Sequence, residues 1–211
     1  MGPRVAVVDY GMCNLDSVRR ALEEAGGRPF VTGDPGELDA ADRIVLPGVG
    51  AFADAVRNLR DRGLDDALRK QVLDDGVPFL GVCLGMQLLA TAGHEGGRTD
   101  GLGWVAGEVV RLEPTGAGER VPHVGWNEVH ASGASPLFEG IPDRTDFYFV
   151  HSFHLRCDDG GDVLATTPYC GSFTSAVARG HVFGVQFHPE KSQRHGIRLL
   201  RNFLNAGWAG C

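Results

Sequence analysis

Residues 78–89 read P-F-L-G-V-C-L-G-M-Q-L-L, and this stretch is the most informative about the fold. Its apolar start predicts a buried strand that ends at Cys83, and the residues after Cys83 are typical of a helix. A strand that turns sharply into a helix exposes the side chain at the turn and aims a helix N-terminus at it. Gly81 and Gly85 flank the turn and allow the backbone to bend tightly. The stretch therefore predicts an α/β fold with a reactive position at Cys83.

The first half of the chain continues this alternation of strands and helices. Strands are predicted at residues 5–8, 28–32, 44–46 and 79–82, with helical stretches at 15–25 and 53–73. Continuous apolar strands separated by helices imply a doubly wound, mostly parallel sheet with helices on both faces. Ligands of such sheets bind at the carboxyl ends of the strands. The loops after Val8, Leu46 and Val82 meet at that edge.

The second half has a different pattern. Residues 104–185 predict several short strands and no long helix, so we expect a smaller mixed or antiparallel region there. Loops are expected at 96–103 and 113–119, and a last helix at 197–204 that ends at Gly207. No repeat and no linker interrupts the chain, and we therefore expect a single domain over residues 1–211.

The composition argues against several classes of protein. The chain has 211 residues, a net charge of −7 and no dense lysine and arginine cluster, which disfavours a nucleic-acid surface. No apolar stretch has the roughly 20 residues that cross a bilayer, and no signal peptide precedes the first strand. Five cysteines without a C-x-x-C pair disfavour a zinc site or a disulfide framework. We expect a cytoplasmic protein with no membrane or nucleic-acid partner, no metal and no cofactor.

A histidine and a carboxylate follow another apolar run, in the segment G-V-Q-F-H-P-E-K-S of residues 184–192. Pro189 restricts His188 to an extended conformation, which suits a rigidly held base, and Glu190 can orient that base. Each residue alone also fits an ordinary loop, as Cys83 alone fits a small core residue. Together on one α/β framework, the three predict nucleophilic catalysis by a thiolate.

The segment L-P-G-V-G-A-F of residues 46–52 lies at the same predicted edge. It could be a plain strand-to-helix loop, where proline and glycine are common. It could also present a backbone N–H to an oxyanion, because acyl transfer needs donors where the tetrahedral charge develops. We expect the amides of Val49 and Leu84 to be the two donors.

These motifs resemble the class I (triad) glutamine amidotransferases. Within them, the chain is similar to the glutaminase subunits of imidazole glycerol phosphate synthase. The segments that carry this similarity are D-Y-G-M-C-N at 9–14, P-H-V-G-W-N at 122–127, Y-F-V-H-S-F at 148–153 and H-P-E-K-S-Q at 188–193. The triad motifs are shared by many amidotransferases, whereas P-H-V-G-W-N and the lysine after H-P-E are more particular. The resemblance runs from Val5 to about Phe203, implies a flavodoxin-like fold and leaves no room for a fused synthase domain.

The resemblance implies a role for each matching position. Cys83 attacks the side-chain amide of L-glutamine and forms a γ-glutamyl thioester. His188 protonates the departing ammonia and then activates water, while Glu190 holds the tautomer of His188. The positions implied to bind the substrate are Gly50, Gln87, Glu95, Ser152 and Phe153. The positions implied to face a synthase partner are Asn14, Trp126, Tyr148 and Lys191, of which the two aromatic residues could also be core residues.

Four other residues carry weaker signals. Cys13 stands where the family more often has glycine, and it is either an inert small residue or an oxidation-prone thiol near the interface. Glu95 lies in a glycine-rich loop, residues 93–100, whose register the sequence leaves open. His123 and His151 have no carboxylate at a useful spacing, so we interpret both as structural or interface residues.

The activity implied by the resemblance is hydrolysis of L-glutamine to glutamate and ammonia. The ammonia would pass to a (β/α)₈ cyclase subunit in a heterodimer that makes imidazole glycerol phosphate and aminoimidazole carboxamide ribotide in histidine biosynthesis. The lone subunit would be a poor glutaminase if the peptide at Val49, which has a glycine on each side, turns its N–H away at rest.

Three alternatives remain open. One is a glutaminase subunit of anthranilate or aminodeoxychorismate synthase, against which P-H-V-G-W-N and Lys191 argue. Another is a non-catalytic flavodoxin-like binding module, against which the intact triad argues. The last is a γ-glutamyl hydrolase or a cysteine peptidase that acts alone.

Overall fold

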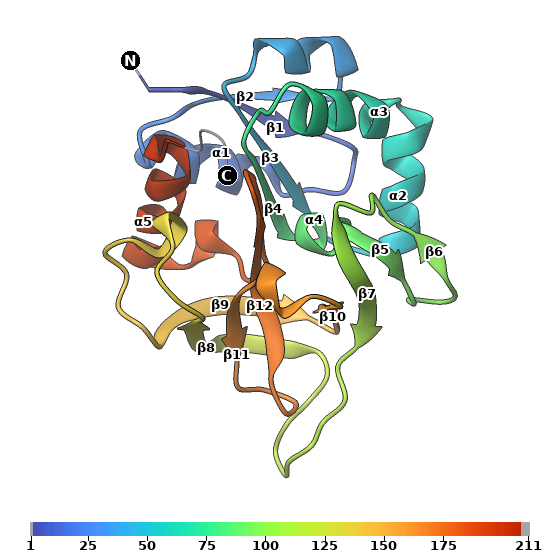
Figure 1. The fold of residues 1–211 in the computed structure, drawn as a ribbon, viewed down its shortest axis with the longest axis vertical. Coiled ribbons are helices and arrows are strands. Elements are labelled where there is room, and N and C mark those ends of the chain that lie inside the picture. The colour runs from blue at the N-terminus through green and yellow to red at the C-terminus, as the bar shows by residue number, and fades with distance from the viewer. Residues whose placement is uncertain (1, 208–211) are drawn as a thin grey trace.

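The computed structural model describes residues 2–207, and a nine-stranded sheet runs through its centre (Figure 1). Cys211 therefore lies outside the described residues. From one edge to the other, the strands are β2 (Arg28–Thr32), β1 (Arg4–Val8), β3 (Arg43–Gly48), β4 (Phe79–Cys83), β13 (Val182–Val185), β12 (Phe173–Arg179), β11 (Val163–Thr167), β8 (His123–Ala131) and β9 (Thr145–His151).

Strand direction divides this sheet into two parts. The strands from β2 to β13 pair in parallel, and the strands from β13 to β9 pair antiparallel. The doubly wound, mostly parallel sheet that the first half predicts is confirmed, and so is the antiparallel region of the second half.

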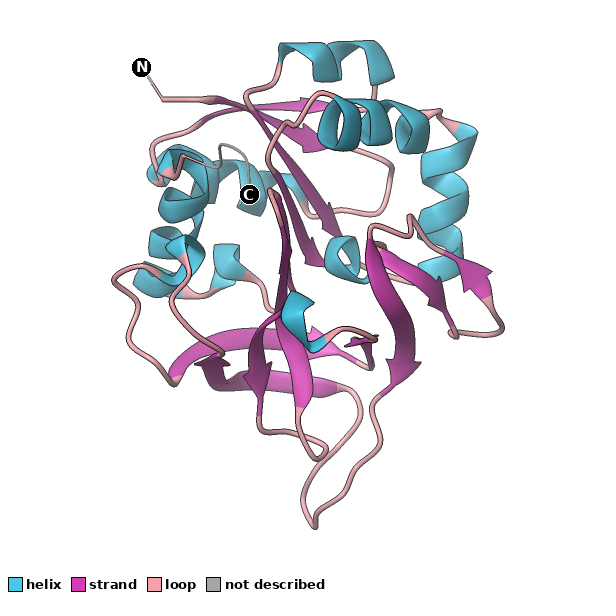
Figure 2. Cartoon of the chain, viewed as in Figure 1, coloured by secondary structure: helices cyan, strands magenta, loops and turns pink. Residues whose placement is uncertain are grey.

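Helices cover both faces of the parallel part (Figures 1 and 2). Along β1, Val5 and Val7 join the core beneath α1 and α5, whereas Ala6 and Val8 join the core beneath α2 and α3. Because successive strand residues point to opposite faces, a continuous apolar strand needs cover on both sides. The helices have the bounds α1 (Leu15–Glu24), α2 (Phe52–Asp61), α3 (Leu64–Arg69), α4 (Leu84–Gln87) and α5 (Gln193–Asn205).

A second, four-stranded sheet lies beside the first. Its order is β10 (Phe153–Cys157), β7 (Val105–Arg111), β5 (Ala90–Gly93) and β6 (Thr99–Asp100). The chain passes from β9 of the large sheet to β10 of the small one through Ser152 alone. This crossing brings the backbone of residues 152–153 to the junction of the two sheets. Short helical turns complete the fold, at η1 (Pro35–Ala40), η2 (Lys70–Asp74), η3 (Pro136–Phe138), η4 (Gly160–Asp162) and η5 (Pro189–Lys191).

The predicted helix after Cys83 is present, and it is short. It has four residues, all of them buried, before the chain turns into β5. Gly85 packs so closely on β3 that a Cβ there would collide with the carbonyl oxygen of Leu46. A helix of one turn has few aligned peptide dipoles, so it contributes less to a thiolate than a full helix would.

Three boundaries also differ from the prediction. β3 continues through Pro47 and Gly48, because these residues lie opposite Val82 and Cys83 in parallel register. The segment 96–103, expected to be a loop, contains β6, and α5 ends at Asn205 rather than at Gly207. Within residues 2–207, every helix is too short or too polar to cross a bilayer.

Candidate active site

Cys83 stands at the turn between β4 and α4. Its backbone angles are φ 54° and ψ −108°, a region that residues other than glycine rarely adopt. Space for the turn comes from Gly81, where a Cβ would lie 2.5 Å from the carbonyl oxygen of Gly85. Strained backbone of this kind persists where the surrounding structure imposes it, and it is typical of a nucleophile elbow.

His188 and Glu190 follow β13, which is the parallel neighbour of β4, with Val185 opposite Val82. The residues after the two strands therefore meet at the carboxyl edge of the sheet. His188 Nδ1 lies 2.8 Å from Glu190 Oε1, and the two side chains are 4% and 3% exposed. Because the Glu190 carboxylate accepts a hydrogen bond at Nδ1, the proton of the neutral ring stays on Nδ1. Nε2 is then available to exchange a proton with Cys83.

The protonation of His188 results from opposing effects. Burial by itself lowers the pKa of His188, but the neighbouring Cys83 sulphur and the hydrogen-bonded Glu190 carboxylate outweigh burial and raise this pKa to about 10. Nε2 has no hydrogen bond of standard geometry among the described residues. Catalytic hydrogen bonds are often long in free enzymes and tighten when substrate binds. The site therefore favours an imidazolium beside the sulphur, which is what a thiolate requires.

A cavity of about 240 Å³ opens beside Cys83. It is smaller than the pockets that enclose drug-sized ligands, so it suits a small metabolite. Its lining combines all the predicted oxyanion and substrate positions with two further residues: Val49, Gly50, Leu84, Gln87, Glu95, Ser152 and Phe153, joined by Val150 and His151. The structure therefore brings together residues that the sequence analysis selected one by one.

Glu95 is held at the start of α2. Its Oε2 accepts a hydrogen bond of 2.9 Å from the backbone N–H of Phe52, the first residue of that helix. A carboxylate is stabilised at a helix N-terminus by the unpaired amides and the helix dipole. This contact holds Glu95 at the start of α2, where the residue lines the cavity.

The amide of Val49 is engaged outside the cavity. Gly48 pairs with Cys83 at the end of β3, which brings the next peptide close to the sulphur. The Val49 N–H, however, donates a hydrogen bond of 2.8 Å to the carbonyl of Met12. In this conformation, the amide cannot also donate to an oxyanion at Cys83.

The four predicted interface residues lie close together. Asn14 and Lys191 line a narrow recess that also includes Val49, His188 and Glu190. Lys191 Nζ lies 5.6 Å from the centroid of the Tyr148 ring, and this ring meets Trp126 edge to face at 6.0 Å. Trp126 is 47% exposed, so it is not a core residue.

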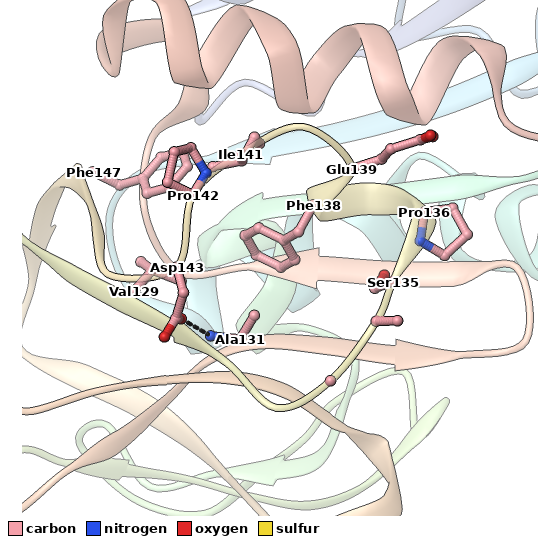
Figure 3. A pocket seen from close by; sticks show the side chains of 12 residues that line it. Val129, Ala131, Ser135, Pro136, Phe138, Glu139, Ile141, Pro142, Asp143 and Phe147 are labelled. Atoms are coloured by element: carbon pink, nitrogen blue, oxygen red, sulfur yellow. Dashed lines mark hydrogen bonds between the residues drawn. The ribbon is translucent and has the colours of Figure 1, made fainter.

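A larger cavity of about 620 Å³ lies elsewhere (Figure 3). Phe138, Ile141 and Pro142 surround it, and Asp143 beside it accepts a hydrogen bond from the backbone of Ala131. Its lining contains no cysteine or histidine. The candidate nucleophile, Cys83, lines the smaller cavity.

The sequence analysis missed three participants. Gln186 was treated as part of an apolar run, yet its Nε2 lies 3.6 Å from Cys83 Sγ. A polar residue inside such a run was the available signal. His151 lines the cavity, although it was interpreted as structural or interfacial. The carbonyl of Met12 had no signal in the sequence, because every residue has a carbonyl.

Cys13 is a half-buried hydrogen-bond donor rather than a reactive thiol. Its Sγ lies 3.4 Å from the carbonyl oxygen of Pro47 and 3.6 Å from that of Val8. Burial raises the pKa of this thiol to about 11, so it is neutral at pH 7. This geometry favours the inert alternative. Among residues 2–207, His, Cys, Asp and Glu side chains form no group of three that could hold a metal ion.

Comparison with known proteins defines the class. The description "Glutamine amidotransferase class-I" matches residues 6–206, and the chain belongs to this family. A chain of PurLQS from Thermotoga maritima shares the fold, with a TM-score of 0.76, 22% identity and coverage of 97% of this chain and 99% of that one.

Curated relatives narrow the class further. The chain is 51% identical to imidazole glycerol phosphate synthase subunit HisH of Moorella thermoacetica, over 98% of each chain. It is 50% identical to the HisH subunit of Methylococcus capsulatus, over 95% of each chain. It is 45% identical to HisH 1 of Campylobacter jejuni strain RM1221, over 95% of this chain and 98% of that one.

Proposed function

We propose that this chain is the glutaminase subunit of an imidazole glycerol phosphate synthase. It hydrolyses L-glutamine to glutamate and ammonia as one domain over residues 1–211, in the cytoplasm, and serves histidine biosynthesis. The observation that carries the proposal is the buried set of Cys83, His188 and Glu190 beside a cavity lined by the expected substrate residues. The near full-length similarity to HisH subunits supports the choice of synthase.

The reaction runs in two halves. The Cys83 sulphur forms a bond to the side-chain carbonyl carbon of glutamine, and the electron pair moves to the carbonyl oxygen. When the carbonyl re-forms, the C–N bond breaks, and His188 gives its proton to the departing nitrogen, which leaves as ammonia. His188 then takes a proton from water, which attacks the thioester and releases glutamate and the thiolate. Glu190 holds the imidazole in the tautomer that both halves need.

The substrate ends would be held by the cavity wall. Glu95 would bind the ammonium group of glutamine, and the backbone of Ser152 and Phe153 would bind its carboxylate, because all three residues line the cavity. Gly50 and Gln87 line the same cavity and would complete the substrate site. No cofactor takes part in these steps.

The resting enzyme lacks one oxyanion donor. The Leu84 amide follows the nucleophile, but the Val49 amide is bound to the Met12 carbonyl. One missing donor costs about a hundredfold to a thousandfold in rate. A partner that favours the rotated peptide would restore activity by binding the two states differently.

The partner is a (β/α)₈ cyclase subunit, in a heterodimer that passes ammonia to the cyclase. It would dock on the face formed by Asn14, Trp126, Tyr148 and Lys191. Exposed apolar side chains mark such a face, and Val124 adds to it with 56% of its surface exposed. Because Asn14 and Lys191 share a recess with Val49, a partner on this face would reach the oxyanion peptide.

The central test is glutamine turnover by the lone subunit, by the complex with a candidate cyclase, and by the complex with the cyclase's nucleotide substrate. We expect activity to rise by about a hundredfold or more between the first and the last, from the restored donor. Equal rates in all three would contradict the switch and indicate a free-standing hydrolase. Lys191→Ala should weaken the activation and leave the basal rate intact.

Two further measurements separate the alternatives. A γ-glutamyl affinity label such as diazo-oxo-norleucine should modify Cys83 and spare Cys13 and Cys157, whose thiol pKa values burial raises to about 11. Labelling of Cys13 instead would disprove Cys83 as nucleophile. Failure to bind the cyclase, or binding to an anthranilate or aminodeoxychorismate synthase component, would move the chain to another synthase.

A further inference from the structure

A buried side-chain amide, that of Gln186, lies against the sulphur of Cys83. Gln186 directly follows β13, is fully buried, and donates its backbone N–H to the carbonyl of Ser175 at 2.9 Å. Its side-chain Nε2 lies 3.6 Å from Cys83 Sγ, within hydrogen-bonding reach of a sulphur atom. The mechanism described above assigns no task to this group. A buried side-chain nitrogen that faces a nucleophilic sulphur is a reason to ask whether it acts in the chemistry.

The direction of this amide follows from its neighbours. The carbonyl oxygen of Phe153 can only accept hydrogen bonds, and Gln87 Nε2 lies 2.8 Å from it. The same Nε2 lies 3.0 Å from the Gln186 side chain, which must therefore turn its oxygen toward Gln87. The N–H₂ end of Gln186 is left facing Cys83. His151 Nδ1, 2.9 Å from the Phe153 carbonyl, occupies the second acceptor position of that oxygen.

The sulphur has a different partner in each protonation state. As a thiol, Cys83 can donate to the carbonyl of Val150, 3.9 Å away. As a thiolate, it can only accept, and the donors that face it are the Gln186 amide and the His188 imidazolium. A hydrogen bond to the charged form favours that form. The Gln186 amide is therefore arranged to increase the thiolate fraction.

We propose that Gln186 is a further catalytic residue, whose side-chain amide donates a hydrogen bond to the Cys83 thiolate while Gln87 and the Phe153 carbonyl fix its direction. The proposal rests on Cys83 being the nucleophile of the proposed function. It adds to the triad a neutral donor that carries no proton through the reaction. Its contribution is electrostatic, because it stabilises the charged nucleophile before attack.

The test is the pH profile of alkylation of Cys83 by iodoacetamide in the full chain, followed by peptide mapping. Gln186→Met keeps a long unbranched side chain and removes the donor. The midpoint of the profile should rise by about one pH unit, and alkylation below the midpoint should slow about tenfold, the size expected for one hydrogen bond to a charged group. Above both midpoints, the variant should react as fast as the wild type or faster, because a more basic thiolate is the better nucleophile.

A matched control is Gln71→Met, which removes another buried glutamine amide, in η2, where its partner is Asp39. The Cys83 profile of this control should equal that of the wild type. Glutamine turnover by the Gln186→Met complex should show kcat lowered about tenfold at pH values below the wild-type alkylation midpoint, with KM unchanged. Alkylation of Cys83 requires no glutamine hydrolysis. The alkylation profile therefore tests the role of Gln186, and glutamine turnover by the wild type tests the glutaminase assignment, so a failure of one can be told from a failure of the other.

Two results would overturn the proposal. One is an unchanged alkylation profile in Gln186→Met, and the other is a rate lowered equally at every pH, which would indicate a structural role. If a thermal unfolding test shows that Gln186→Met does not fold, the alkylation profile of Gln87→Met tests the proposal instead. This variant frees the Gln186 amide to turn and should raise the midpoint in the same direction by a smaller amount. An unmoved midpoint in Gln87→Met would then refute the proposal.

Discussion

Lowering the pH from 7 to 5 should destabilise this chain through two buried histidines. His123 and His151 are 4% and 6% exposed, and His123 Nδ1 lies 3.0 Å from His151 Nε2. The His123 ring stacks on Tyr169 and Phe149, with centroids 4.0 and 4.9 Å apart. Burial lowers the pKa of His123 to about 4 and that of His151 to about 3. Both rings are therefore neutral in the folded chain at pH 5, whereas the unfolded chain protonates them near pH 6.5.

The sign and size of the effect follow from proton linkage. Between pH 6.5 and the folded pKa, each histidine costs about 1.4 kcal/mol of stability per pH unit, or about 2 kcal/mol from pH 7 to 5. His188 acts in the opposite direction, because its stabilisation is present below pH 6.5 and is lost as the pH rises toward about 10. When the pH falls from 7 to 5, the contribution of His188 to the free energy of unfolding rises by less than about 1 kcal/mol. The three histidines together should cost about 3 kcal/mol, a large part of a typical domain's stability of about 5–15 kcal/mol.

Urea unfolding of the wild type and of His123→Phe at pH 7 and pH 5 would measure the effect. An aromatic ring keeps the stacking, and the variant lacks the titrating group. The stability of the wild type minus that of the variant should fall by about 2 kcal/mol between the two pH values. His94→Gln, at an exposed position, is the control. For this variant, the stability of the wild type minus that of the variant should change by less than about 1 kcal/mol between the two pH values. A difference for His123→Phe that is the same at both pH values would refute the neutral, buried state of this ring.

Two further predictions concern the triad and the elbow. In the complex, Glu190→Gln should lower kcat for glutamine less than His188→Ala does. The double variant should lower kcat little more than His188→Ala alone, because the effects of members of one catalytic unit are not additive. An unchanged kcat in Glu190→Gln would show that Glu190 has no part in catalysis. Gly85→Ala should lower the free energy of unfolding by about 3 kcal/mol or more through its collision with the backbone of β3, whereas Gly133→Ala, in open space, should stay within about 0.5 kcal/mol. Equal thermal stability of the two alanine variants would argue against the close packing of α4 on β3.

Local patterns in the sequence were sufficient for the framework and for predicting that the three triad candidates lie at one edge of the sheet. Apolar strands that alternate with amphipathic helices leave few arrangements other than a covered parallel sheet. In such a sheet, the residues after neighbouring strands meet at one edge. The proximity of Cys83 and His188 was therefore predictable before any contact between them was known. Resemblance to known amidotransferases supplied the substrate and interface positions, which periodicity alone could not have identified.

The tertiary structure alone decided how polar groups pair across the sheet. Cys83 and Gln186 are 103 residues apart, and the direction of the Gln186 amide depends on Gln87 and on a carbonyl of another strand. The resting contact of the Val49 amide with Met12 likewise joins two loops that only the strand order brings together. A sequence encodes periodicity and turns, because these depend on neighbours along the chain. Hydrogen-bond direction depends on which donors and acceptors become neighbours in space, and packing determines that.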